Sequence, residues 1–207
     1  MTRSIKVLIA DDHSVVRMGL TSLLGTAKNV EIVGEAIDGA DAVRKTARLN
    51  PDVVIMDLVM PRKDGVAATE EILAANAAVK ILILTTFGTS DDIARALRAG
   101  AAGAIMKSAT NRELLAAVQA VAAGKRVVSD EVEGILANDP PIPDLSQRQH
   151  EILESISRGL TNKDIATQLD ISLESVKSHI KIILEKLGAA SRTEAASIAQ
   201  RKHLLAH

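Results

Sequence analysis

Residues 6–12 read KVLIADD, a short apolar run that stops at two adjacent carboxylates, and residues 53–57 repeat the pattern as VVIMD. A short apolar run bounded by polar residues is typical of a strand buried on both faces. Three further runs of this kind lie at residues 31–34, 81–85 and 104–106. The sequence therefore predicts five strands.

An amphipathic segment with helical spacing follows each predicted strand. These segments lie at residues 15–24, 40–49, 66–75, 91–99 and 113–123. Five consecutive β/α units predict an α/β fold, a doubly wound five-stranded parallel sheet with helices on both faces. In such sheets, ligands bind at the carboxyl ends of the strands.

The composition excludes several classes of function. The chain has 207 residues and no cysteine, which rules out disulfides and zinc–thiolate sites. One Phe, no Tyr and no Trp leave little for stacking on single-stranded nucleic acid. No apolar run approaches the ~20 residues of a membrane helix, and the N-terminus carries no secretory pattern. We expect a cytoplasmic protein with no membrane contact.

The chain changes character at a proline-rich segment. Residues 138–143, NDPPIP, hold three of the five prolines, and such a segment cannot continue a helix. Residues 173–207 carry six Lys or Arg against three Glu, although the net charge of the chain is −1. We predict a first domain over residues 1–123, a linker over 124–144 and an all-α, four-helix domain over 145–207.

Ionisable and hydroxyl side chains follow or end four of the five predicted strands. Asp11 and Asp12 end the first strand and Asp57 the third. These strands are neighbours in a doubly wound sheet, so the three carboxylates converge. Their repulsion favours a hard cation such as Mg²⁺. Thr85 and Lys107 close the fourth and fifth strands. This set suits phosphoryl transfer to an aspartate.

Residues 5–123 resemble a bacterial response-regulator receiver domain, which implies a flavodoxin-like sheet with strand order 2-1-3-4-5. The motifs that carry the resemblance are IADDH (9–13), VVIMDLVMPRKDG (53–65), ILTTF (83–87) and LRAGAAGAIMKS (97–108).

The resemblance implies a role for each residue of the acidic group. Asp57 would accept a phosphoryl group from a histidine kinase, and the receiver would catalyse its own phosphorylation and dephosphorylation without otherwise being an enzyme. The implied Mg²⁺ ligands are Asp12 directly, Asp11 mainly through water, Asp57, and the backbone carbonyl of Val59. Two further residues, Thr85 and Lys107, would contact the phosphoryl group.

The second domain contains two helical segments joined by a tight turn. Thr161 is predicted to cap the first helix, and residues 170–172 form a three-residue turn before the second. This is the outline of a helix-turn-helix, whose second helix enters the major groove. Lys177 and Lys181 project from that helix, away from its apolar stripe, and lysine can bond guanine or phosphate there.

Residues 145–200 resemble a LuxR-type helix-turn-helix domain in the motifs GLTNKDIATQLDIS (159–172), SVKSHI (175–180) and EKLGAASRTEA (185–195). The whole chain resembles a response regulator of the NarL/FixJ family. The resemblance implies base contacts from Lys177, Ser178 and Lys181. It also implies phosphate contacts near six residues: Thr161, Asn162, Lys163, His179, Lys186 and Arg192.

The same resemblance implies the partners. They are double-stranded DNA, a sensor histidine kinase and, as a further candidate, RNA polymerase. The active form would be a homodimer, and residues 193–202 correspond to the helix that often forms the dimer contact on DNA.

Three alternatives stay open. Receivers often carry Tyr or Phe where this sequence has Ala104, so the usual aromatic switch cannot operate, and a receiver that dimerises and binds DNA without phosphorylation is the main alternative. A haloacid-dehalogenase-type phosphatase would need a carboxylate at the position of Val59, which argues against it. An adaptor that binds no DNA is disfavoured by Lys177 and Lys181.

Overall fold

The computed structural model describes residues 4–86, 90–143, 145–202 and 204–205. The chain forms two compact units, Met1–Pro140 and Pro141–His207. Phe87, the last residue of the ILTTF motif, lies outside the described residues.

The first unit is built on a parallel sheet in the order β2-β1-β3-β4-β5-β6. Its strands are β1 (Ile5–Ala10), β2 (Val30–Ala36), β3 (Val53–Met56), β4 (Lys80–Thr85), β5 (Gly103–Met106) and β6 (Val127–Val128). All four residues of β3 are buried, because a central strand of a parallel sheet is covered on both faces. The predicted doubly wound sheet and the order 2-1-3-4-5 of its first five strands are confirmed.

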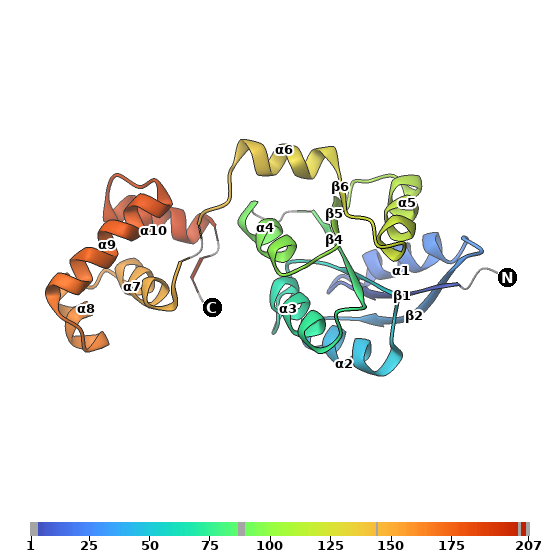
Figure 1. Ribbon diagram of the computed structural model, residues 1–207, viewed down its shortest axis with the longest axis horizontal. Coiled ribbons are helices and arrows are strands. Elements are labelled where there is room, and N and C mark those ends of the chain that lie inside the picture. The colour runs from blue at the N-terminus through green and yellow to red at the C-terminus, as the bar shows by residue number, and fades with distance from the viewer. Residues whose placement is uncertain (1–3, 87–89, 144, 203, 206–207) are drawn as a thin grey trace. The chain divides into compact units, whose positions relative to one another are not determined.

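Helices cover both faces of this sheet (Figure 1). One face carries α1 (Ser14–Leu24) and α5 (Asn111–Ala122), and the other carries α2 (Gly39–Leu49), α3 (Gly65–Ala75), α4 (Ser90–Arg98) and α6 (Asp130–Asn138). Along β1, Leu8 belongs to one core and Ile9 to the other, because successive strand residues point to opposite faces.

The predictions of five strands and of a linker over residues 124–144 need correction. β6 pairs in parallel with β5, with Gly103 opposite Val127, and Val132 of α6 is fully buried in the core of the first unit. The hydroxyl of Ser90, at the start of α4, also donates to the Asp139 carboxylate at 2.7 Å. A two-residue strand has no periodicity to detect, so only its pairing with β5 reveals it.

The second unit consists of helices around its own core. They are α7 (Gln147–Ser157), α8 (Asn162–Leu169), α9 (Leu173–Leu187) and α10 (Arg192–Arg201). Ile152, Ile165 and Val176 are each fully buried there, as the helical periodicity of the sequence predicts.

Two glycines offer a matched test of the packing around Asp57. A Cβ at Gly65 would lie 2.0 Å from the Asp57 carbonyl oxygen, whereas a Cβ at Gly134 in α6 would meet nothing within 4 Å. We expect Gly65→Ala to lower the free energy of unfolding by about 1–3 kcal/mol, because backbone must move. We expect Gly134→Ala to raise it by about 0.5–1 kcal/mol, because alanine favours the helix. Urea unfolding followed by circular dichroism measures both; an unchanged Gly65→Ala protein would contradict the tight contact.

Candidate functional site

The acidic residues meet at the carboxyl edge of the sheet. β1 and β3 are paired, with Ala10 opposite Met56, so the residues that follow them lie side by side. Ligand atoms of Asp11, Asp12, His13 and Asp57 lie within 4.8 Å of one another. Asp11 and Asp57 are buried, whereas the side chain of Asp12 is 30% exposed.

Lys107 links the two buried carboxylates. Its Nζ lies 2.7 Å from Asp57 Oδ2 and 2.5 Å from Asp11 Oδ2, and its side chain is 9% exposed. The lysine reaches this place because it follows β5, where its backbone N–H donates to the Thr85 carbonyl at 2.8 Å. One ammonium group therefore serves two carboxylates.

The site is electrostatically unbalanced. Burial raises the pKa of Asp57, and the neighbouring Asp11 carboxylate adds to this, although Lys107 opposes it. Burial lowers the pKa of Lys107, but its bonds to Asp11 and Asp57 outweigh this and leave that pKa raised. The lysine is therefore held protonated, and the excess negative charge favours an added cation.

Thr85 contributes a hydroxyl at the same edge. It ends β4 and is 1% exposed, and its Oγ1 has no hydrogen-bond partner among the described residues. A buried hydroxyl without a partner is costly. Carboxylate oxygens and this free hydroxyl form a donor set that fits Mg²⁺ and a phosphoryl group.

Two further features surround the acidic group. Val59, the predicted carbonyl ligand, is 54% exposed in the loop that follows Asp57, and this loop closes where the N–H of Gly65 donates to the Leu58 carbonyl at 2.9 Å. His13 was not selected from the sequence, yet its Nδ1 lies 2.7 Å from Asp12 Oδ1. His13 directly follows Asp12 in the motif IADDH, so the sequence already placed this histidine beside the acidic group.

The helix-turn-helix has the predicted local structure. Asp170 ends α8 in the left-handed region, with φ 50°, and the Ser172 hydroxyl accepts the N–H of Ser175 at the start of α9. Thr161 caps α8 and exchanges hydrogen bonds with Asp164 in a capping box. These caps fix the short turn between the two helices.

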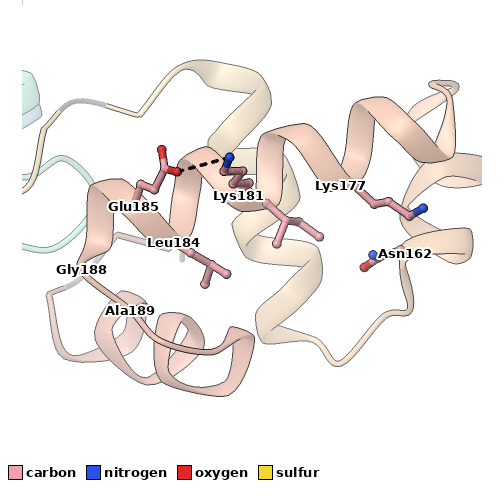
Figure 2. Close-up of a pocket in the computed structure, with 8 residues that line it drawn as sticks. Asn162, Lys177, Lys181, Leu184, Glu185, Gly188 and Ala189 are labelled. Carbon is pink, nitrogen blue, oxygen red and sulfur yellow. Dashed lines mark ion pairs between the residues drawn. The ribbon is translucent and has the colours of Figure 1, made fainter.

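The two candidate reading lysines are exposed on α9. Lys177 pairs with Glu174 at 2.9 Å, and Lys181 pairs with Glu185 at 3.9 Å; Figure 2 shows the second pair. The lysine side chains are 55% and 79% exposed. Such exposed pairs contribute little energy, so both lysines can exchange their partners for DNA.

A groove of about 460 Å³ runs beside these lysines (Figure 2). Three candidate DNA-binding residues line it, namely Asn162, Lys177 and Lys181. The remaining lining residues are Ile180, Leu184, Glu185, Gly188 and Ala189. The structure thus brings residues of α8 and α9 to one surface of the second unit.

The other predicted DNA contacts differ in how freely they can reach DNA. Ser178, Thr161 and Lys163 are exposed. Lys186 instead donates to Gln149 Oε1 at 3.0 Å, and Arg192 donates to the Leu160 carbonyl at 2.6 Å and to Asn162 Oδ1 at 3.4 Å. His179 Nδ1 is buried without a partner among the described residues. Lys186 and Arg192 therefore also connect helices within the unit.

Comparisons with known proteins match both units. Residues 7–119 match the response regulator receiver domain, and residues 143–199 match the bacterial regulatory proteins of the luxR family. The chain is 39% identical to the transcriptional regulatory protein LiaR of Bacillus subtilis (strain 168), over 97% of this chain and 99% of LiaR.

Two solved structures are similar over almost the whole chain. The response regulator ChrA of a heme-sensing two-component system is 39% identical, with TM-score 0.59 over 98% of this chain and 99% of ChrA. A structure of two RcsB dimers bound to two parallel DNAs is 26% identical, with TM-score 0.68 over 96% of this chain and 98% of RcsB.

The fold and the site define a receiver domain joined to a LuxR-type DNA-binding domain. The chain belongs to the NarL/FixJ family of two-component response regulators, which regulate transcription rather than act as metabolic enzymes. Within the part of the chain that the structure describes, no helix has the length and apolarity to span a membrane.

Proposed function

We propose that Asp57 accepts a phosphoryl group from a sensor histidine kinase. The observation that carries this is the Lys107 ammonium 2.7 Å from the Asp57 carboxylate, within an acidic group at the carboxyl edge of the sheet. A carboxylate oxygen of Asp57 attacks phosphorus, and the bond from phosphorus to the donor breaks. Lys107 and the free hydroxyl of Thr85 then bind the oxygens of the transferred group.

The proposed metal ligands are Asp11, Asp12, Asp57 and the carbonyl of Val59. When bound, Mg²⁺ would neutralise charge on the carboxylates and on the incoming phosphoryl oxygens. The receiver would also support hydrolysis at Asp57, which restores the carboxylate. This phosphoryl chemistry at its own aspartate is the enzymatic activity that we propose.

The second unit is proposed to bind double-stranded DNA through α9. Lys177, Ser178 and Lys181 would contact base edges, and the six residues named from the resemblance would lie at phosphates. RcsB binds DNA as dimers, and pairing would double the phosphate contacts of this chain and raise its affinity. We propose that phosphorylation favours this homodimer, which acts on the chromosome in the cytoplasm, with RNA polymerase as a further partner.

Ala104 keeps the phosphorylation-independent alternative open. It is fully buried in β5, where its carbonyl accepts the N–H of Ser129 at 3.1 Å. An alanine at this position has no ring to reorient. In this alternative, the receivers of two chains would pair, and the dimer would bind DNA, while Asp57 is unmodified.

One experiment separates the two forms of control. The full chain is incubated with Mg²⁺ and acetyl phosphate, intact mass reports phosphorylation, and footprinting with sedimentation reports DNA binding and pairing. Phosphorylation that strengthens both supports the proposal. Phosphorylation that changes neither favours the phosphate-independent regulator.

Mg²⁺ is expected to stabilise the first unit by binding at the acidic group that includes Asp57. The pKa of Asp57 is raised in the folded chain, so ionisation of Asp57 lowers the free energy of unfolding. This loss of stability begins as the pH rises past the ordinary pKa of an aspartate and is complete above the raised pKa of Asp57. Without metal, Asp57→Asn should therefore raise the melting temperature at pH 7, by about 2–4 °C if about 1 kcal/mol is regained. Mg²⁺ should raise the melting temperature of the parent more than that of the variant. Calorimetry checks both; equal Mg²⁺ shifts would contradict a site that includes Asp57.

A further inference from the structure

Arg17 lies outside the acidic group but bonds to the main chain that carries it. From α1, its Nη1 donates to the carbonyl oxygens of Asp11 at 2.9 Å and Asp12 at 3.2 Å. The Arg17 side chain is only 13% exposed. One guanidinium nitrogen therefore holds the backbone carbonyls of both Asp11 and Asp12.

The guanidinium is itself held in place from β2. Arg17 Nε lies 3.2 Å from Glu35 Oε2, and Glu35 Oε1 accepts the hydroxyl of Thr21 at 2.9 Å. Thr21 lies one turn beyond Arg17 on α1. The planar fork of arginine thus connects the end of β1 with α1 and β2, and a lysine ammonium cannot copy that planar geometry.

We infer that Arg17 is a positioning residue for the divalent-cation site. By holding the carbonyls of Asp11 and Asp12, it fixes the main chain so that the two carboxylates stay within reach of one ion. This inference rests on the metal site of the proposed function. Groups that orient metal ligands typically change metal affinity by about 10–100-fold when they are removed.

The charge of Arg17 makes this inference sharply testable. A positive charge beside a cation site repels the cation, so removing it should tighten metal binding if charge alone mattered. Positioning predicts the opposite, because the freed main chain no longer holds the carboxylates together. The sign of the change in affinity therefore separates the two effects.

The experiment is a Mn²⁺ titration of the full chain, followed by electron paramagnetic resonance of the free ion. We expect Arg17→Gln, which removes the charge, and Arg17→Lys, which keeps it, each to bind Mn²⁺ roughly 10-fold more weakly than the parent. The matched control is Arg44→Gln on α2, since Arg44 also pairs with a carboxylate, that of Asp41 at 2.9 Å, but is 69% exposed. The control should bind as the parent does.

Thr21→Val provides a second variant that leaves Arg17 intact and removes one support of Glu35. We expect it to weaken Mn²⁺ binding by a smaller factor than the Arg17 variants do. Circular dichroism checks that the variant is folded. If the Arg17 variants do not fold, Thr21→Val still tests the inference. Unchanged or tighter binding in the folded variants overturns the inference while leaving the metal site standing. A parent chain that binds no Mn²⁺ overturns the metal site as well.

Discussion

Asp57→Asn is expected to abolish phosphorylation of the chain by acetyl phosphate in the presence of Mg²⁺. An amide nitrogen or oxygen is a poor nucleophile compared with a carboxylate, and the variant also loses the charge that faces Lys107 at 2.7 Å. Intact mass should show one added phosphoryl group on the parent and none on the variant.

Asp64→Asn is the matched control for this experiment. Asp64 lies in the loop that follows Asp57 and caps α3 by accepting the N–H of Ala67 at 2.7 Å, a role that asparagine fills equally well. This variant should be labelled as the parent is. A phosphoryl group that persists on Asp57→Asn would place the acceptor on another residue.

Lys177→Ala combined with Lys181→Ala is expected to remove most sequence-specific DNA binding. Each good base contact contributes about 1–3 kcal/mol of discrimination. Loss of both should therefore weaken specific binding by roughly 30- to 20,000-fold, counting about 1.4 kcal/mol for each factor of ten. Footprinting at fixed salt concentration measures the loss, since phosphate contacts make affinity depend on salt.

Arg44→Ala controls for the loss of a paired surface cation. Arg44 pairs with Asp41 three residues earlier, as Lys177 pairs with Glu174, but it lies on α2 in the first unit. Its footprint should be unchanged. If the double lysine variant protects the same DNA as the parent at the same concentration, α9 does not read bases through these lysines.

The fold of the first unit was largely predictable, because its signals are local. Apolar runs such as residues 53–57 mark buried strands, and the helical segments between them impose parallel connections. Strand β6 was missed because two residues carry no period. Helix α6 was also missed, because its segment was predicted to be part of the linker. Its apolar residues Val132, Ile135 and Leu136 pack into the core of the first unit, a contact that only the tertiary structure shows.

The sequence by itself determined which residues end the strands, and hence that Asp11 and Asp57 share one edge, since parallel strands all present their carboxyl ends on the same side. The tertiary structure decided how those side chains are connected. That Lys107 joins two carboxylates and that Arg17 holds the carbonyls of Asp11 and Asp12 depends on side-chain directions and on the packing of helices against the sheet. These contacts form between different helices and strands of one domain, and the pattern of residues within each element does not encode them.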